Sequence, residues 1–552
     1  MLDPPYGLAA PDAEGADRTT PTLAVALCAL AIGIGVVLRF VVSTPLWLDE
    51  ALSVEIASLA PAELLEALRH DGHPPLYYLL LHGWMRVVGT SDLAVRSLSG
   101  IFAVTALVPM WILARRRGGR DLALVAVAML ALSPFAVRYA TEARMYSLVM
   151  LEVLVAAVLI DELLDDVERS AMARRVRLGL VALLSGALAL THYWGIFVVL
   201  ASVAVLVVAA WLAGDADQRR RRTTVAGALA LGGLLFVPWL GAFVYQAGHT
   251  GTPWAPPSRP GALVGVTLRD LAAGDVDEAA LGVAVFGALL LLGLGGRAVD
   301  RHRVEVDVRT RSTVRGEAAV VAVTFVMAAA VSFVAGSAFS SRYAAVVAPF
   351  VVLIAAAGVV TLTDRWFRLG VLVVVFAVAG AGIADQLTTE RTQAGQIAAA
   401  IRTTLAEPGA GTAKQATVLY CPDQLGPAGS RALNGPPALG RGADEPLLAP
   451  ADVGERVYPT DAPPGLVDWV DYAARNATAD PSAFAQQILA RQPVDGSIFL
   501  VWDPAYDTFE GQCEGLRAGL AAARPGAVDV VANDPDGAFE HAALTWFPPV
   551  AP

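Results

Sequence analysis

The sequence predicts an α-helical polytopic membrane protein with about eleven transmembrane helices, followed by an extracytoplasmic α/β domain. Three observations carry this prediction. First, 56% of the 552 residues are hydrophobic and only 16% are charged, which is unusually apolar for a soluble protein. Second, apolar runs of about 17–22 residues alternate with charged clusters up to residue 386. Third, the remaining residues, 387–552, lack such runs and are rich in glycine and proline.

The net charge of −11 excludes the basic footprint of a nucleic-acid-binding protein. Residues 1–20 are polar and lack the basic start of a cleaved signal peptide, so we expect a disordered cytoplasmic tail. Residues 21–386 are then expected to form one transmembrane domain that begins with an uncleaved anchor. Its predicted spans cover residues 22–42, 93–114, 121–138, 146–161, 178–195, 196–213, 225–246, 279–296, 317–336, 344–362 and 370–386.

Arginine fixes the predicted orientation of these spans. If the N-terminus lies inside, every arginine cluster between spans falls on a cytoplasmic loop, as the positive-inside rule demands. The opposite orientation would break the rule at each of these loops. We therefore expect a multi-pass protein of the plasma membrane with a cytoplasmic N-terminus and an outer C-terminal domain. The clusters lie within residues 115–120, 169–177, 219–222, 297–315 and 365–368.

Within the first outer loop, residues 43–92, the segment 51–89 is too polar to span the membrane twice. Leu52, Ile56 and Leu59 recur at helical spacing opposite Glu55, which is typical of an amphipathic helix on the outer interface. Pro61 either breaks this helix or starts a second turn, and Pro74 and Pro75 suit the first turn of another short helix, 75–88. We expect these interfacial helices to form the wall of an active site.

The C-terminal domain, residues 387–552, alternates short apolar strands with helices, which favours a small α/β layer domain. Cys421 and Cys513 both lie in it. An outer location would allow one disulfide, although the sequence does not show whether the two residues are close. The domain is equally compatible with binding a substrate or partner and with serving as a lid or scaffold. The expected strands are 417–421, 497–502 and 528–532, and the expected helices are 396–405, 482–491 and 513–523.

Two adjacent carboxylates, Asp49 and Glu50, follow the first span and are the leading candidates for chemistry. Carboxylates at the mouth of a transmembrane helix cost solvation energy unless they have partners or a function. One interpretation is structural, with Asp49 as the cap of the helix that follows. The other is a general base held at the membrane rim.

His73 is the next candidate, in the run Asp71-Gly72-His73-Pro74-Pro75. A histidine at a helix start is more often structural. Here two prolines stiffen its backbone, which suits a residue held against a substrate. Tyr77 and Tyr78 follow, and their plainer interpretation is that of interfacial aromatic residues.

Arginines on the predicted outer side need anions as partners. Arg138 and Arg144 flank the joint between the third and fourth spans, and Glu142 suits an i,i+4 pair with Arg138. Lipid headgroups are the plain partners, and a lipid-linked phosphate is the more specific one because guanidinium matches phosphate geometry. Arg342, next to Tyr343, faces outward against the positive-inside trend, which indicates a function, helix packing or snorkelling.

His192 ends the fifth span on the same side. The sequence contains no zinc-spaced Cys/His cluster, no phosphate-binding Walker loop and no Gly-x-Ser-x-Gly motif. An enzyme on the outer face has no supply of ATP. It would need an activated substrate delivered by the membrane, such as a polyprenyl-phosphate sugar.

Together these motifs resemble the GT-C glycosyltransferases, in particular their family-39-like branch of protein O-mannosyltransferases and the more distant aminoarabinose transferases. The resemblance covers about residues 22–386. An outer C-terminal domain also occurs in actinobacterial mannosyl- and arabinofuranosyltransferases of this superfamily. His73 stands where the aminoarabinose enzymes carry lysine. The motifs are Trp47-Leu48-Asp49-Glu50, His73-Pro74-Pro75-Leu76-Tyr77-Tyr78, Glu142-Ala143-Arg144-Met145-Tyr146 and Arg342-Tyr343.

The resemblance implies a GT-C fold and an inverting transfer of a sugar from a polyprenyl-monophosphate donor. By position, Asp49 is implied as the general base, and Glu50 as a residue that orients the acceptor or shares a divalent ion, Mg²⁺ or Mn²⁺. The sequence shows no dedicated metal-ligand cage. The implied donor-phosphate residues are His73, Arg138, Arg144, Arg342 and Tyr343, and the expected substrate-cavity residues are Tyr77, Tyr146 and His192.

We therefore expect a glycosyltransferase that takes mannose or arabinofuranose to an envelope glycan, glycolipid or protein. Two other functions compete with it. A lipid or oligosaccharide transporter predicts internal repeats and broken helices with polar midplane residues, and the sequence shows no convincing repeat. A non-catalytic envelope assembly protein would leave Asp49 and His73 without a function.

Overall fold

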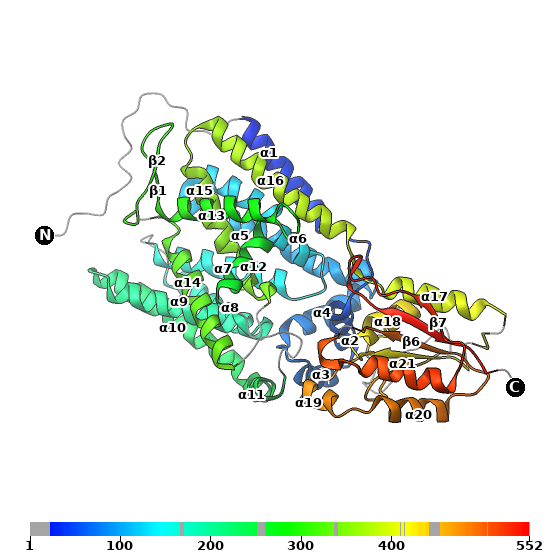
Figure 1. Ribbon diagram of the computed structural model, residues 1–552. Helices are drawn as coiled ribbons and strands as arrows, with labels where there is room; N and C mark the ends of the chain where they lie inside the picture. The colour runs from blue at the N-terminus through cyan, green and yellow to red at the C-terminus, as the bar shows by residue number, and fades with distance from the viewer. Residues whose placement is uncertain are drawn as a thin grey trace.

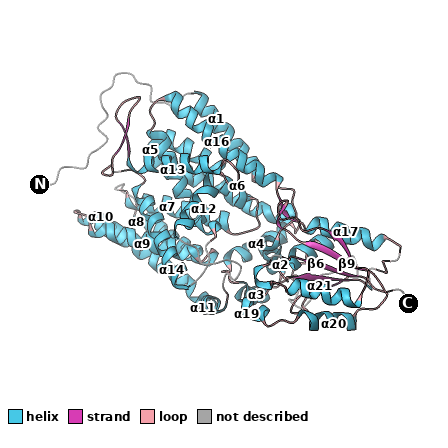
Figure 2. Cartoon of the chain, in the orientation of Figure 1, coloured by secondary structure: helices cyan, strands magenta, loops and turns pink. Residues whose placement is uncertain are grey.

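The computed structural model describes residues 22–165, 170–250, 260–310, 312–335, 340–408, 410–412, 415–440, 453–504 and 506–550. A helical part extends to the end of α16, and an α/β part lies beside one end of it (Figures 1 and 2). The expected tail, residues 1–20, lies outside the described residues. Each part has the secondary structure that the sequence predicts for it.

Every predicted span overlaps a helix, so the polytopic helical class is confirmed. The spans correspond to α1 (Thr22–Leu38), α5 (Asp92–Ala131, two spans), α7 (Tyr146–Leu164), α8 (Ala171–Thr191), α9 (Trp194–Trp211), α10 to α11 (Ala216–Gly232, η1 Gly233–Trp239, Leu240–His249), α13 (Ala279–Gly295), α14 (Arg315–Ala335), α15 (Ala348–Thr361) and α16 (Arg365–Thr388). The structure adds α6 (Pro134–Ala140), α12 (Pro260–Ala272), η2 (Ser341–Val346) and a hairpin of β1 (Gly296–Ala298) and β2 (Val304–Val306).

Helix α5 joins two spans through a break at Gly118 and Gly119. Gly119 has φ 77°, a left-handed conformation that glycine adopts without the steric cost of a side chain. Just before the break, Arg117 donates to Asp161 of α7, and its Nε donates to Glu317 of α14 at 2.7 Å. These bonds tie three helices together at the end that the arginine pattern predicts to be cytoplasmic.

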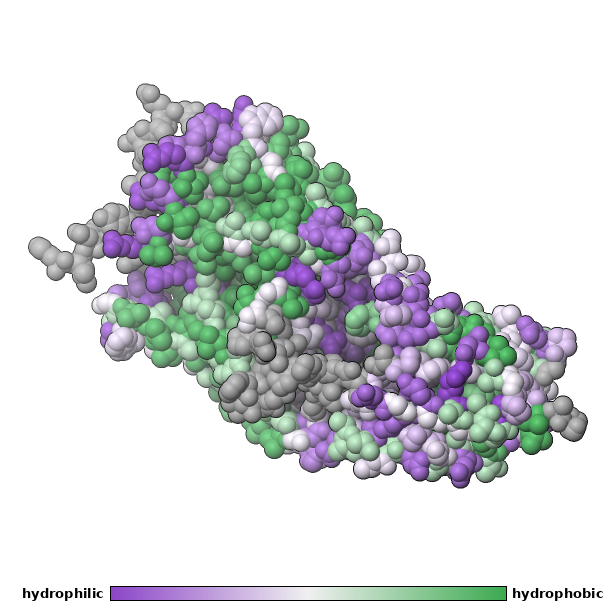
Figure 3. Space-filling model, in the orientation of Figure 1, coloured by the Kyte–Doolittle hydropathy of each residue, from purple (hydrophilic) through white to green (hydrophobic). Residues whose placement is uncertain are grey.

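Apolar helices give the molecule its membrane character. Among the described residues, four helical segments are long and apolar enough to cross a membrane, namely 92–131, 194–211, 216–249 and 365–388. Helices α1, α13 and α15 are shorter and also apolar. Hydrophobic residues gather over the helical part, whereas the surface of the α/β part is mixed (Figure 3). The chain is therefore a multi-pass membrane protein.

The first outer loop forms the helices α2 (Leu48–Ser58), α3 (Pro61–Asp71) and α4 (Leu76–Val88). The helices themselves were expected, but the exposed polar face of α2 was not confirmed. All residues of α2 from Glu50 to Ser58 are buried, and Glu55 is only 1% exposed. The reason is that α18 (Leu425–Asn434) of the α/β part packs on α2, which no local pattern in the sequence reveals.

The α/β part contains a five-stranded sheet in the order β5-β4-β6-β9-β7. Its strands are β4 (Thr417–Cys421), β5 (Gly454–Val457), β6 (Ile498–Trp502), β7 (Val528–Val531) and β9 (Ala543–Phe547). Strand β4 is parallel to β5 and β6, whereas β9 is antiparallel to β6 and β7. Helices α17 (Ala394–Ala406) and α18 lie on one side of the sheet, and α20 (Pro481–Arg491) and α21 (Gln512–Ala523) on the other (Figure 1).

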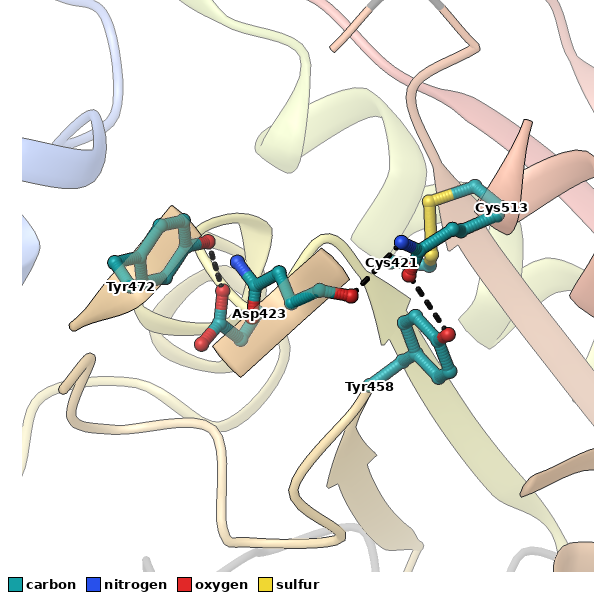
Figure 4. Close-up of a disulfide and its surroundings, with 7 residues drawn as sticks. Cys421, Asp423, Tyr458, Tyr472 and Cys513 are labelled. Atoms are coloured by element: carbon teal, nitrogen blue, oxygen red, sulfur yellow. Dashed lines mark hydrogen bonds between the residues drawn. A yellow bond between two sulfur atoms is a disulfide. The ribbon is translucent and has the colours of Figure 1, made fainter. Parts of the chain in front are cut away.

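The three strands and three helices expected in this part are present, while β5, β9 and α18 were not predicted. Cys421, at the end of β4, forms a disulfide with Cys513, the second residue of α21 (Figure 4). This bond fastens the central sheet to one of its covering helices. Cys28 of α1 is buried and free.

A small parallel strand pair joins the two parts. Strand β3 (Glu390–Thr392) begins just after α16 ends and pairs with β8 (Ala538–Glu540) near the end of the chain. One cluster of buried hydrophobic side chains runs from the helical part into the α/β part. The α/β part is therefore packed directly against the outer-loop helices.

Candidate active site

Asp49 lies at the start of α2 and accepts a hydrogen bond from an arginine that is distant in the sequence. Nη1 of Arg342, in η2, donates to its Oδ2 at 2.5 Å, and Nη2 of Arg144 lies 3.8 Å from the same oxygen. The Asp49 side chain is 17% exposed, so a substrate can reach it. The structural interpretation, in which Asp49 caps α2, is wrong, because Trp47 holds the cap position and no side-chain cap bond forms there.

Arg144 is the centre of the hydrogen-bond network around Asp49. Its Nη1 donates to the Ser53 hydroxyl at 2.9 Å and to the Tyr78 hydroxyl at 3.3 Å, and its Nη2 contacts His73 Nε2 at 3.0 Å. The side chain is only 3% exposed, and its Nε is buried with no partner among the described residues. Arg144 therefore has a fixed position and one unused donor.

His73 connects Arg144 to a buried carboxylate. An arginine only donates, so Nε2 of His73 accepts from Arg144, and the ring proton then lies on Nδ1. Nδ1 donates to Asp71 Oδ2 at 2.7 Å, and the Tyr78 hydroxyl donates to the same oxygen at 3.1 Å. Burial raises the pKa of Asp71, but His73 and Arg144 outweigh it, so the pKa lies below its usual value. Asp71 is therefore a carboxylate that orients His73.

The backbone between α3 and α4 explains how His73 reaches this position. Gly72 has φ 89° and ends α3 in a left-handed conformation, which favours glycine. Two prolines follow, and the second, Pro75, holds the N-cap position of α4 with helical φ and ψ of −86° and −17°. The short turn therefore presents His73 to Arg144.

Glu50 faces away from Asp49 into a fully buried cluster. Arg96 of α5 binds both carboxylate oxygens, with Nε donating at 2.7 Å and Nη2 at 2.6 Å. The backbone N–H of Ala143 donates at 2.9 Å, and Nη1 of Arg391 lies 3.5 Å away. Burial raises the pKa of Glu50, but Arg96 and Arg391 bring it below the usual value. Glu50 is therefore fully buried and is held by two arginines and a backbone N–H.

Arg138 and Arg144, which flank the same joint, have different partners. Nε of Arg138 donates to Glu142 Oε1 at 2.5 Å, which is the i,i+4 pair that the sequence indicates. Arg391 donates to the carbonyl and the hydroxyl of Thr141 at 2.8 and 2.7 Å. The joint between α6 and α7 is thereby fixed from both sides.

A row of rings lies next to Arg342. The ring of Tyr146 lies 5.7 Å from that of His192, which lies 5.4 Å from that of Tyr343. Trp194 lies 5.6 Å from Tyr343 on the other side. The hydroxyl of Tyr146 is buried with no hydrogen-bond partner among the described residues. This wall of rings suits a sugar, whose faces are apolar and whose edges are polar.

The structure thus brings together Asp49, His73, Arg144 and Arg342, with Tyr146, His192 and Tyr343 next to them. Tyr77 is not in this group. It is fully buried, and its hydroxyl contacts the Ser99 hydroxyl at 3.1 Å, which donates to the Arg144 carbonyl at 3.0 Å. Tyr77 therefore supports Arg144 from behind.

Sequence reasoning missed several residues of this region. Asp71 belongs to the same motif as His73, and its spacing of two residues was the available signal. Arg96 and Arg391 face the predicted outer side, against the positive-inside trend, as Arg342 does. Glu540 of β8 accepts a bond from the backbone N–H of Leu48 at 3.1 Å, and nothing in its sequence context indicates this contact.

The residues do not fit a divalent ion shared by Asp49 and Glu50. The two carboxylates bind different arginines. Across the described ranges, no group of three or more histidine, cysteine, aspartate or glutamate residues could hold a metal ion. The positive charge at this site comes from arginine.

The chain matches one protein family and several solved structures. The family described as dolichyl-phosphate-mannose-protein mannosyltransferase matches residues 72–241, which include His73 and Arg144. A comparison with curated protein sequences gives no match.

Solved structures are similar over nearly the whole chain. ArnT from Cupriavidus metallidurans in the apo state has a TM-score of 0.55 at 10% identity, covering 95% of this chain and 98% of that one. The same enzyme bound to undecaprenyl phosphate gives 0.52 at 11% identity, with coverages of 95% and 97%. The Archaeoglobus fulgidus oligosaccharyltransferase, in complex with zinc and sulfate, gives 0.50 at 14% identity, with coverages of 94% and 73%. The chain therefore has the GT-C fold that these solved structures share, and the family match covers residues 72–241, which is less than half of the chain.

Proposed function

We propose that the protein transfers a sugar from a polyprenyl-monophosphate donor to an acceptor hydroxyl at the outer face of the plasma membrane, with inversion at the anomeric carbon. The observation that carries this proposal is the position of Asp49, a partly exposed carboxylate that contacts Arg342 and lies close to Arg144. A base and two phosphate-binding cations are the groups that such a transfer needs. The similarity to ArnT, which has been solved with bound undecaprenyl phosphate, supports the lipid-phosphate donor.

The reaction is a single displacement. The acceptor oxygen attacks the anomeric carbon and forms the new glycosidic bond, while the bond from that carbon to the phosphate oxygen breaks. Asp49 takes the proton of the acceptor hydroxyl, and the electron pair of the broken bond stays on the polyprenyl phosphate. Because attack and departure take place on opposite faces, the anomeric configuration inverts.

The arginines stabilise charge that develops on the leaving phosphate. Nε of Arg144 and Nε of Arg342 are both buried without a hydrogen-bond partner among the described residues, so each keeps a donor for a phosphate oxygen. When a phosphate binds Arg342, that arginine exchanges part of its contact with Asp49, and the carboxylate becomes free to accept a proton. Tyr343 and His73 are the other two residues that we propose contact the donor phosphate.

Glu50 and Arg138 act less directly in this proposal. Glu50 holds Arg96 and the backbone of Ala143, and this fixes the α6–α7 joint relative to α2. Arg138 adds positive charge from beside Glu142 and reaches the donor phosphate only if it exchanges that partner. Tyr146 and His192 line the sugar side of the site. Tyr77 acts indirectly, because its contact with Ser99 supports Arg144.

The orientation of the protein in the membrane rests on two observations. Arginine clusters alternate between loops, which favours a cytoplasmic N-terminus and an outer C-terminal domain. The disulfide between Cys421 and Cys513 lies in that domain, and disulfides persist in oxidising compartments. Both favour a donor that is presented on the outer face.

Mannose and arabinofuranose remain the two sugars of the proposal. The description of the matching family supports mannose. The acceptor is an envelope glycan, a glycolipid or a protein.

The test is sugar transfer by purified protein. Radiolabelled polyprenyl-phosphate mannose and polyprenyl-phosphate arabinofuranose are each incubated with envelope extract and either wild type, Asp49→Asn or Glu66→Gln. Glu66 is an exposed carboxylate of α3 and provides the matched control. We expect transfer by wild type and Glu66→Gln, and a loss of about 10²–10⁴-fold in Asp49→Asn with donor binding kept.

Equal transfer by wild type and Asp49→Asn would remove Asp49 from the role of base. No transfer from either donor, together with movement of labelled lipid across vesicles, would favour a transporter.

A further inference from the structure

The helix that carries Asp49 has no cap of its own. Its cap position is held by Trp47, whose side chain accepts no hydrogen bond, although the first N–H groups of a helix need acceptors. The missing acceptor comes from the other end of the chain. Oε1 of Glu540 accepts from the backbone N–H of Leu48 at 3.1 Å, across 492 residues of sequence.

Glu540 is itself held firmly. Thr392 of β3 pairs in register with Glu540 of β8, and the Gln393 N–H donates to the Glu540 carbonyl at 3.1 Å. The Gln393 side chain accepts from the N–H groups of Asp534 and Ala542 at 3.1 and 2.9 Å, on either side of β8. The carboxyl group therefore projects from a fixed strand.

A second contact joins the same two segments. The ring of Phe539 packs edge-on against the ring of Trp47, with 5.3 Å between centroids. Trp47 and Leu48 are the two residues directly before Asp49. Strand β8 of the α/β part thus contacts the two residues directly before the proposed base.

The carboxyl group of Glu540 is close to the acidic pair of α2. Burial, with smaller contributions from Asp49 and Glu50, raises the pKa of Glu540 to about 8. Its Oε2 is buried and has no hydrogen-bond partner among the described residues. A protonated carboxyl group can accept the Leu48 bond through Oε1 without placing a further negative charge beside Asp49.

We propose that Glu540 is a positioning residue, which fixes the first turn of α2 and so holds the Asp49 carboxylate in place against Arg342. The inference rests on the proposed function, in which Asp49 is the base. Small misplacements of a reacting group slow a reaction strongly, by on the order of 100-fold for about 1 Å. The α/β part would then be needed for the chemistry as well as for any contact with the acceptor.

The experiment compares Glu540→Gln, Glu540→Ala and Glu390→Ala in the full-length protein. Gln keeps an oxygen for the Leu48 N–H, Ala removes it, and Glu390 is an exposed glutamate on the partner strand. We expect Glu540→Ala to lose about 10-fold or more in kcat with the KM for donor little changed. Glu540→Gln should recover most of the rate, and Glu390→Ala should match wild type.

Hydrogen exchange provides a readout that needs no sugar. In Glu540→Ala, peptides covering residues 46–52 should exchange faster than in wild type, whereas Glu540→Gln should keep their protection. A wild-type exchange rate in Glu540→Ala would overturn the inference, whatever the activity. So would a kcat loss that Glu540→Gln does not relieve. A wild-type protein that transfers no sugar would overturn the proposed function instead, so the two failures are distinguishable.

Discussion

Arg342 and Asp49 form a direct ion pair, with Nη1 donating to Oδ2 at 2.5 Å across 293 residues of sequence. The pair joins the start of α2 to η2, which follows α14. It also occupies the carboxylate. A donor phosphate that competes for Arg342 would release the base as it binds, so activation of the acceptor would follow binding of the donor.

The first prediction concerns the shape of the Arg342 side chain. Arg342→Lys keeps the charge but loses the planar fork that binds phosphate and carboxylate, so kcat/KM should fall by about 10–100-fold. The kcat/KM of Arg342→Gln should fall further than that of Arg342→Lys. Donor titrations with steady-state rates provide the measurement, and Arg69→Gln on the exposed face of α3 is the control. A lysine variant with wild-type kinetics would show that positive charge alone is sufficient at this position.

The second prediction concerns the buried cluster around Glu50. Glu50→Gln leaves Arg96 and Arg391 with an uncompensated buried charge, which typically costs about 3–5 kcal/mol. The unfolding temperature in detergent should fall accordingly. Combining Glu50→Gln with Arg96→Gln should cost less than the sum of the single changes, because the two groups are coupled. Strict additivity in this double-mutant cycle would contradict the ion pair seen at 2.6 Å.

The third prediction is a pH dependence in the α/β part. Asp423 is 3% exposed, its Oδ1 accepts from the Tyr472 hydroxyl at 2.5 Å (Figure 4), and burial raises its pKa to about 6 from 3.8. The folded state therefore keeps this proton at pH values where the unfolded chain has released it. Stability should fall by on the order of 3 kcal/mol as the pH rises from about 4 through 6.

Asp423→Asn keeps an oxygen for Tyr472 and removes the titration. Urea unfolding at pH 4.5 and pH 7, followed by tryptophan fluorescence, should show a smaller difference in the variant than in wild type. If both proteins lose the same stability between these pH values, Asp423 is not the responsible group.

The fourth prediction concerns the disulfide. Cys421 and Cys513 are 92 residues apart, and opening a loop of that size typically costs about 2–5 kcal/mol. The double variant Cys421→Ser with Cys513→Ser should unfold at a lower temperature and become sensitive to limited proteolysis within residues 387–552. Dithiothreitol should destabilise wild type and leave the double variant unchanged. A reducing agent that affects both equally would point to another cause.

The helices of the membrane part could be predicted from hydropathy because each span is a local property of about twenty residues. Helix α18 could not be predicted. It contains Gly426, Pro427 and Gly429, which are poor helix formers, and it forms because it packs between β4 and α2. Gly429 is required at this contact, since a Cβ atom there would lie 2.3 Å from the Tyr420 ring.

At the candidate site, too, some features could be predicted from the sequence and others could not. Asp49, Arg144 and Arg342 could be selected because charged residues at the rim of apolar helices are costly and therefore conspicuous. The pairing of these residues could not be predicted from the sequence, because the contact between Asp49 and Arg342 depends on how η2 packs beside α7. The resemblance implies different roles for Asp49 and Glu50 but places both of them at the same site. Neighbouring residues on a helix point in directions about 100° apart, and here they serve different arginines.

Strand β3 begins two residues after the last membrane helix, and this has a consequence for anyone who exchanges parts between related proteins. A chimera joined between Thr388 and Glu390 would import Arg391 from the new partner while keeping its counterpart Glu50 from the old one. The domain boundary that the change in composition suggests therefore separates residues of one buried ion-pair cluster. A graft keeps that cluster whole only if it carries Arg96 and residues 141–143 as well as α2 and residues 390–550, and it is the exchange we expect to fold.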